Sequence, residues 1–330
     1  MISVKELTKK YGRNLAVDHI SFEVQKGEIV GFLGPNGAGK TTTMRMLTCF
    51  LPPTAGSATV AGFDILEQPL EVKKRIGYLP ETPPLYLEMD TTAYLTFVGR
   101  LKGVPTADLP KRVNYVCERC AITDVRHKLL GKLSKGYRQR VGLAQAIIHN
   151  PDVLILDEPT AGLDPKQINE TRDLIRSLAG DHTIILSTHI LPEVEQTCEK
   201  VIIINRGRLV ATDSVQNLQS RARGAEIMHV EVAGRNGNLE SSLVQSRFEQ
   251  IAGVTRVSLK QSHDNRNTFE IESQKGFVRG DLARAVVESG WDLNELRPTA
   301  MSLEEVFLQL TGQNAPAEPQ AVAVAQEKQS

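Results

Sequence analysis

This chain of 330 residues is 41% hydrophobic and 24% charged, an ordinary balance for a globular protein with room for two domains. Its 39 basic and 39 acidic residues cancel, so no overall positive field favours a nucleic-acid partner. The longest aliphatic runs have about four residues, whereas a membrane span needs about 20, and the first residues do not resemble a secretion signal. We therefore expect a cytoplasmic chain that does not cross a membrane by itself.

The first part of the chain predicts strands that lead into a glycine-rich loop. Strands are expected over 2–7, 16–24 and 29–33 and a helix over 42–47, with Tyr11 in the connection after the first strand. A strand, then a loop, then a helix is the setting that a phosphate-binding loop requires.

The loop Gly34–Thr41 fits the pattern G-x-x-x-x-G-K-[ST]. Its glycines let successive backbone N–H groups point at a phosphate chain, and the helix start adds partial positive charge. Lys40 adds a full charge, and the Thr41 hydroxyl is placed to bind Mg²⁺. The alternative is a bare glycine-rich turn. We predict nucleoside triphosphate binding by Gly34, Pro35, Asn36, Gly37, Ala38, Gly39, Lys40, Thr41 and Thr42.

A second motif, which contains two acids, follows later in the chain. Val153–Asp157 is an aliphatic strand, and its last residue and Glu158 are both acids. In company with a phosphate loop, Asp157 can hold the Mg²⁺ shell through Thr41 and water, and Glu158 can orient an attacking water. The alternative is a pair of surface acids after a strand.

Strands and helices alternate around these motifs, which predicts a P-loop α/β domain up to about residue 220. Between the motifs we expect strands over 57–61 and 76–79 and helices over 70–75 and from 91 to about 128; after them we expect helices over 166–179 and 191–198 and strands over 183–188 and 200–205.

Leu133-Ser134-Lys135-Gly136 opens a helix rich in Ala, Leu and Ile. By itself this segment indicates a helix cap that could also face an anion. Five motifs in this order resemble the ATP-binding subunit of ABC transporters over residues 1 to about 220: the phosphate loop, Leu-Ser-x-Gly, Leu-Asp-Glu-Pro-Thr, Gly-Leu-Asp and Ser-Thr-His. The resemblance implies an ABC-ATPase domain with an antiparallel β subdomain and a helical subdomain.

The resemblance also implies roles for single residues. Tyr11 falls where the family has an aromatic ring that stacks on adenine. Asp157 closes the Walker B motif, Glu158 is the catalytic base, and His189 contacts the γ-phosphate. ATP and Mg²⁺ are the implied ligands, with Thr41, Glu81 and Asp157 at the metal.

The family assembles as a head-to-tail dimer, which implies a homodimer here. Ser134, Lys135, Gly136 and Asp164 would then meet the ATP held by the partner subunit. The chain departs from the family pattern at Lys135 and Tyr137, where Gly and Gln are usual, and at Glu81, where Gln is common.

The resemblance further implies a separate multi-span membrane permease that docks near Glu81–Met89 and provides the contact with the inner face of the cell membrane. The Gly-Tyr-Leu-Pro-Glu segment and the ending Leu303-Glu-Glu-Val-Phe-Leu resemble the ABC-2 group, which includes gliding-motility-associated and drug-exporter subunits.

The composition changes at about residue 220, and a second pattern begins. We expect a strand, a helix, two strands, a helix and a strand, the β-α-β-β-α-β order of a small ferredoxin-like α+β module over 225–311. An amphipathic helix over 302–310 would close it, and the polar tail 313–330 is expected to be disordered.

Two functions from different classes compete. The first is the ATP-hydrolysing subunit of an ABC-2-type exporter, which ATP dimerises and hydrolysis releases. The second is a soluble ABC-type ATPase that acts on ribosomes or DNA, but the single phosphate loop and the neutral charge disfavour it. A P-loop kinase fits less well, because the paired acids and the Leu-Ser-x-Gly helix do not belong to one.

Overall fold

The computed structural model describes residues 1–221, 225–234, 239–263, 265–274, 279–299 and 307. The chain divides into two compact units, Met1–Arg221 and Ala222–Ser330. The predicted tail over 313–330 and nearly all of the helix predicted over 302–310 lie outside the described residues.

A six-stranded sheet forms the centre of residues 1–221, in the order β10-β9-β3-β8-β7-β6. Neighbouring strands from β9 to β6 are parallel, and β10 pairs with β9 antiparallel. Every residue of β3, β7 and β8 is buried, as expected when both faces of a sheet are covered. The strands are β3 Ile29–Leu33, β6 Ile76–Leu79, β7 Val153–Asp157, β8 Thr183–Thr188, β9 Lys200–Asn205 and β10 Arg208–Ser214.

A smaller sheet covers helix α1, Lys40–Leu47. Its order is β2-β1-β4-β5, all antiparallel. Buried side chains of this sheet, of α1 and of the parallel sheet form one apolar core, so α1 is packed between two sheets. The strands are β1 Ile2–Tyr11, β2 Asn14–Val24, β4 Ala55–Val60 and β5 Phe63–Asp64.

The prediction that Tyr11 lies in a connection is wrong. The first strand extends to Tyr11, which pairs with Asn14, because a turn of only two residues joins the strands. Gly12 has φ of 57°, a left-handed conformation that glycine adopts without steric cost. The hairpin can therefore pair to its last residue.

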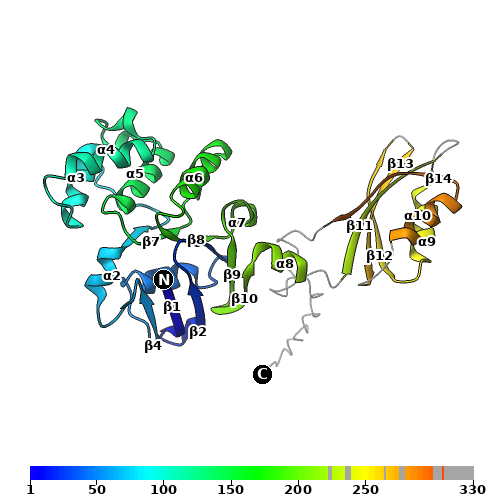
Figure 1. Ribbon diagram of the computed structural model, residues 1–330, viewed down its shortest axis with the longest axis horizontal. Coiled ribbons are helices and arrows are strands. Elements are labelled where there is room, and N and C mark those ends of the chain that lie inside the picture. The colour runs from blue at the N-terminus through cyan, green and yellow to red at the C-terminus, as the bar shows by residue number, and fades with distance from the viewer. Residues whose placement is uncertain (222–224, 235–238, 264, 275–278, 300–306, 308–330) are drawn as a thin grey trace, which may run out of the picture. The chain divides into compact units, whose positions relative to one another are not determined.

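A helical layer lies on the other side of the parallel sheet from β1, β2 and β4 (Figure 1). It contains α3 Thr91–Leu101, α4 Leu109–Arg119 and α5 Lys135–Ile147. Asp90 caps α3, because its side chain accepts from the Ala93 N–H at 2.8 Å. The remaining helices of the first unit are α2 Pro69–Arg75, α6 Pro165–Ser177, α7 Leu191–Thr197 and α8 Val215–Arg221, with short 3₁₀ turns at Thr123–Val125 and Leu130–Lys132.

The second unit has the predicted β-α-β-β-α-β order, and its sheet runs β12-β13-β11-β14 with every pairing antiparallel. This is the ferredoxin-like arrangement, in which two helices cover one sheet. Phe248, Phe269 and Trp291 meet edge to face in its core. The elements are β11 Ala225–Gly234, α9 Ser241–Glu249, β12 Val254–His263, β13 Arg266–Gln274, α10 Arg279–Glu288 and β14 Trp291–Thr299.

Among the residues that the structure describes, no helix combines the length and the apolar character needed to pass through a bilayer.

The close packing of α5 against β6 yields a stability prediction. A Cβ added at Gly77 would lie 2.2 Å from the Ala146 carbonyl oxygen, which is backbone and cannot turn aside. We expect Gly77→Ala to lower the free energy of unfolding by about 2–3 kcal/mol, measured by urea unfolding. Gly180→Ala is the control, because no atom lies within 4 Å of a Cβ added there. Its positive φ of 86° alone should lower the free energy of unfolding by about 1 kcal/mol. Equal losses in the two variants would contradict the packing argument.

Candidate active site

A cavity of about 230 Å³ lies at the carboxyl ends of the central strands, beside the start of α1. Segments that are far apart in the sequence meet there. Except for Ala16 and Ala161, all of its lining residues are predicted site residues. They are Ala16, Asn36, Gly37, Gly39, Lys40, Thr41, Thr42, Glu81, Glu158, Ala161 and His189.

The glycine-rich loop wraps around the N-terminus of α1, as the sequence pattern requires. Gly37 has φ of 78° and Gly39 has φ of 107°, conformations that a larger residue would adopt only with strain. A Cβ on Gly39 would also lie 2.6 Å from the Ala16 carbonyl oxygen, and one on Gly34 would lie 2.4 Å from that of Ile204. The glycines thus give the loop both its curvature and its fit against β2 and β9.

Lys40 is buried at the base of the loop. Its Nζ donates to the Gly34 carbonyl at 2.8 Å and to that of Pro35 at 3.3 Å. It also lies 3.3 Å from Glu158 Oε1, and both side chains are less than a tenth exposed. A charge pair with so little water around it is strong electrostatically, so the cation is held at a fixed place facing the cavity.

Glu158 turns into the cavity because of its backbone. It follows the last residue of β7 and has φ of 49°, a left-handed conformation that costs a non-glycine residue free energy and is common at functional sites. Its N–H donates to the Ser187 carbonyl at 3.0 Å, which ties the turn to β8. His189 Nδ1 lies 2.9 Å from Glu158 Oε2, so the two side chains predicted to be catalytic are in contact.

Oxygen atoms suited to Mg²⁺ gather beside Lys40. Thr41 Oγ1 donates to Asp157 Oδ1 at 3.4 Å, and Glu81 lines the same cavity. Mg²⁺ binds hydroxyl and carboxylate oxygens, with one or two carboxylates and the substrate phosphates. Within the described residues no cluster of three or more His, Cys, Asp or Glu is placed to hold a metal ion. The donor set fits a metal that enters with a phosphate chain.

Three of the residues predicted to act across a dimer lie at a different cavity, of about 310 Å³. Ser134 caps α5, Gly136 lies in its first turn, and Asp164 caps α6 by accepting from the Gln167 N–H at 2.9 Å. The structure therefore does not bring these residues to the cavity of Lys40 within one chain. This second cavity is lined by Ser134, Gly136, Tyr137, Arg140, Asp164, Lys166, Gln167 and Glu170.

The side chain of Lys135 lies at a different cavity from Ser134 and Gly136, its neighbours in the sequence. Its ammonium lies over Gly162, where an added Cβ would come within 2.2 Å of Nζ. It also lines a third cavity, of about 360 Å³, with Glu81, Leu85 and Arg138. Glu81 is the residue that the first and third cavities share, so the segment after β6 reaches both.

Tyr11 does not line any of these three cavities. Its ring is 46% exposed at the end of β1, and Lys9 Nζ lies 5.4 Å from the ring centroid. The exposed face of the ring is open to a stacking partner.

Several residues that line or support these cavities were not predicted from the sequence, and four of them illustrate why. Ser187 donates to Asp157 Oδ1 and orients it, and its place in the Ser-Thr-His motif could have indicated this. Gln167 fills the space beside Gly136, where a Cβ would come within 2.1 Å of its Oε1. Ala16 and Ala161 line the first cavity with small side chains, and no motif marks them.

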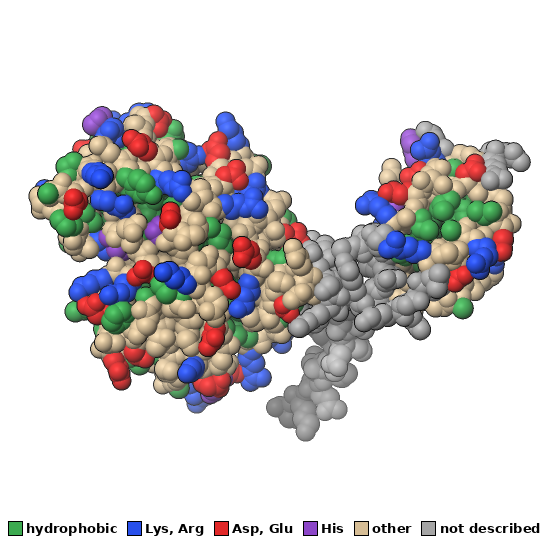
Figure 2. Space-filling view, viewed as in Figure 1, with side chains coloured by type: hydrophobic (Ala, Val, Ile, Leu, Met, Phe, Trp, Pro, Cys, Tyr) green, Lys and Arg blue, Asp and Glu red, His purple; other side chains and the backbone are tan. Residues whose placement is uncertain are grey.

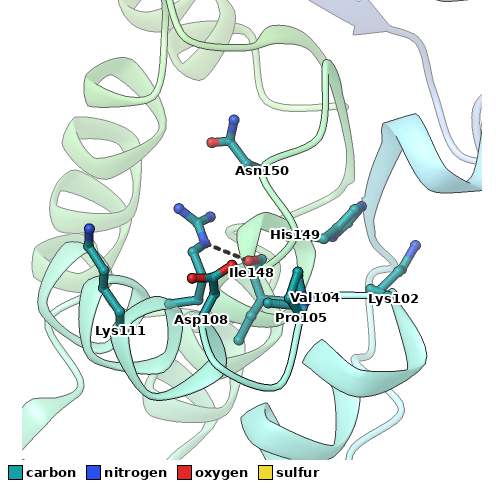
Figure 3. A pocket seen from close by; sticks show the side chains of 10 residues that line it. Lys102, Val104, Pro105, Asp108, Lys111, Ile148, His149 and Asn150 are labelled. Carbon is teal, nitrogen blue, oxygen red and sulfur yellow. Dashed lines mark hydrogen bonds between the residues drawn. The ribbon is translucent and has the colours of Figure 1, made fainter.

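A larger cavity of about 490 Å³ lies between α4 and the end of α5, but no predicted site residue lines it. Figure 3 shows Lys102 and Lys111 on opposite sides of it. Arg112 Nε donates to the Ile148 carbonyl at 2.8 Å. Burial lowers the pKa of His149 to about 4, so that ring is neutral at pH 7. Lys102 and Arg112 donate to backbone carbonyls here, Lys102 to those of Lys73 and Ile76.

Comparison with known proteins agrees with this geometry. A family model described as "ABC transporter" matches residues 17–161. The bacitracin transport ATP-binding protein BcrA of Bacillus licheniformis is 35% identical over 94% of this chain and 97% of its own length. The daunorubicin resistance ATP-binding protein DrrA3 of Streptomyces coeruleorubidus is 34% identical over 94% of this chain and 96% of its own length.

Among solved structures, a dimeric structure of the bacterial ABC transporter cassette MJ0796 matches with a TM-score of 0.60 and 22% identity, over 65% of this chain and 98% of that one. That match shows the fold of the first unit. The relatives match nearly the whole chain, second unit included, and their names agree with the drug-exporter-like group expected from the sequence. The chain therefore belongs to the ATP-binding proteins of the ABC transporter family.

Proposed function

We propose that the chain hydrolyses ATP to drive an ABC-2-type membrane exporter. The observation that carries the chemical part is the contact of Glu158 with both Lys40 and His189 at the mouth of the phosphate loop. A cation, a carboxylate and an imidazole at one end of a glycine-rich loop are the groups that phosphoryl transfer to water requires.

ATP binds with its phosphates on the loop from Gly34 to Thr42 and its γ-phosphate toward Lys40. The adenine stacks on the exposed ring of Tyr11. Thr41, Asp157 and Glu81 hold Mg²⁺, which when bound neutralises phosphate charge. The oxygen donors beside Lys40 support this assignment.

In the hydrolytic step, the oxygen of a water molecule bonds to the γ-phosphorus and the bond from that phosphorus to the β–γ bridging oxygen breaks. Glu158 orients the water and accepts its proton, and ADP leaves with the bridging oxygen. His189, held 2.9 Å from the carboxylate, keeps Glu158 in place and contacts the γ-phosphate. Lys40 stabilises the charge on the phosphate oxygens.

Two copies of the chain complete the site. Ser134, Gly136 and Asp164 line a cavity separate from that of Lys40, and Lys135 lines the third cavity. None of the four lines the Lys40 cavity of its own chain, so they are available to the ATP of a second copy. The N-terminus of α5 presents the Ser134 hydroxyl and backbone N–H groups to a phosphate. A head-to-tail homodimer would then close on two ATP molecules and open after hydrolysis.

The segment Glu81–Met89 is the docking surface for a separate permease. Backbone hydrogen bonds anchor it, from the N–H of Leu130 to Met89 and from the N–H of Gly131 to Leu87, both at 2.9 Å. Tyr86 is half-exposed and packs on Tyr94 and Phe97, which gives the surface a firm aromatic base. The exported cargo is a drug-like or antibiotic compound, by analogy with the names of the full-length relatives.

The same proposal places the chain in the cytoplasm, on the inner face of the cell membrane, with residues 1–220 as the nucleotide-binding domain and 225–311 as an accessory module. The alternative, action on ribosomes or DNA, is disfavoured by the charge distribution. Acidic and basic side chains are interspersed over the face shown in Figure 2, whereas a nucleic-acid surface gathers basic ones.

Lys40→Ala should weaken ATP binding by about tenfold or more, because a charge-assisted contact with phosphate is lost. The measurement is titration with a fluorescent ATP analogue. Lys132→Ala, an exposed lysine outside the cavity, should bind normally. Unchanged binding in Lys40→Ala would contradict the assignment of the loop.

Glu158→Gln should slow hydrolysis by about 10²-fold or more while ATP still binds, since an amide cannot accept the proton. Dimers should then accumulate in ATP and Mg²⁺ on size-exclusion chromatography. Adding Ser134→Arg should return the protein to monomers, because the new side chain fills the second cavity. A Glu158→Gln protein that stays monomeric in ATP would argue against the two-copy site.

Leu85→Asp combined with Tyr86→Asp should abolish transport and leave the basal ATPase rate within about twofold, because charge on the docking surface repels an apolar partner. The matched control is Phe50→Asp with Leu70→Asp, two apolar side chains more than 70% exposed elsewhere on the first unit. Transport that survives the first pair would remove this docking surface.

A further inference from the structure

We propose that Glu193 is a positioning residue that holds Glu158 and His189 in contact. It lies on α7, directly after the loop that carries His189, and is only 6% exposed. None of the sequence motifs includes it. The inference rests on the catalytic roles proposed above for the two residues that it positions.

Both carboxylate oxygens of Glu193 are used. Oε1 accepts from Thr160 Oγ1 at 2.5 Å, and Oε2 accepts from Thr188 Oγ1 at 2.9 Å. The hydroxyl of Thr188 in turn accepts from the Ile190 N–H at 3.0 Å, which directs its own proton toward Glu193. The two threonines are also buried, at 4% and 0% exposed.

The two threonines lie close in the sequence to the two residues proposed to be catalytic. Thr160 follows Glu158 by two residues, and Thr188 directly precedes His189. Strand pairing between β7 and β8 ends at Asp157 and Ser187, and the Glu158 N–H still donates to the Ser187 carbonyl. These backbone bonds leave the side chains of Glu158 and His189 unrestrained. Glu193 continues the connection past the strand ends, because one carboxylate is bonded to both loops. Glu193, Thr160 and Thr188 do not line the cavity, so they hold the 2.9 Å contact between Glu158 and His189 from behind its lining residues.

A carboxylate is a costly way to fill space in a core. Among the described residues no Lys or Arg forms an ion pair with Glu193, so its burial is compensated by hydroxyl groups. An apolar side chain would fill the same volume at lower cost. The geometry points to a carboxylate at position 193 that is needed because it accepts from the hydroxyls of Thr160 and Thr188, which lie on two different loops.

The first test is Glu193→Gln, which keeps the shape but leaves an amide nitrogen that cannot accept from a hydroxyl. We expect kcat for ATP hydrolysis to fall about tenfold or more, with KM for ATP within about twofold of the original, because binding residues lie elsewhere. Thr160→Val, which removes one donor, should behave alike, and Thr160→Ser should restore the rate. Glu199→Gln, an exposed acid just after α7, is the control.

The second test separates positioning from a general loss of structure. If Glu193 acts through the contact with His189, then Glu193→Gln added to His189→Ala should lower kcat no further. A full additional loss in the double variant, or an unchanged kcat in Glu193→Gln and Thr160→Val, would overturn the proposal. Urea unfolding of each variant shows whether the fold survives, and Thr160→Val provides the test if Glu193→Gln does not fold.

Failure of this inference is distinguishable from failure of the proposed function. If Glu158→Gln and His189→Ala leave hydrolysis unchanged, the catalytic roles themselves are wrong. If those two variants are slow and the Glu193 and Thr160 variants are not, only the positioning role is wrong.

Discussion

The parallel pairing of β3, β8 and β7 is the constraint on which the site depends. In this sheet Leu33 is level with Thr188 and Asp157 is level with Ser187, so the three strands end at one edge. The phosphate loop, the acids and the histidine follow those ends directly. Since every residue of these strands is buried, a shift in register would misplace close-packed side chains on both faces of the sheet. The sheet therefore brings Lys40, Glu158 and His189 to one edge, where their side chains make the contacts of 2.9 Å and 3.3 Å.

The helical layer imposes the second constraint. It places the cap of α5 at its own cavity with Asp164 and Gln167, so Ser134 and Gly136 do not reach the phosphate loop of their own chain. In the proposed homodimer, each chain would therefore contribute the phosphate loop to one ATP site and the start of α5 to the other. This division provides a physical reason for ATP-dependent association, because the nucleotide would be the main contact between the halves.

The segment after β6 connects the phosphate site to the helical layer. Glu81 lines both the nucleotide cavity and the cavity under the start of α5, and Lys135 lines the latter. These two residues are departures from the usual family pattern, and they add opposite charges at one place. Lys135 and Arg138 line the same cavity as Glu81, so basic side chains accompany the acid that is added beside the phosphate loop. Long-range repulsion of ATP by Glu81 is correspondingly reduced.

The sequence by itself determined the family, the two-unit organisation of the elements and nine of the residues that line the nucleotide cavity, because glycine-rich loops and strand-end acids obey local rules of spacing. Only the tertiary structure decided that Tyr11 ends a strand, that Lys135 lies over Gly162, and that Glu193 joins Thr160 to Thr188. The last two facts depend on contacts between segments whose separation in the sequence has no fixed spacing, whereas the first depends on a hairpin with a turn of two residues. A buried acid on a short helix has no local signature, because its role is set by the two loops that fold onto it.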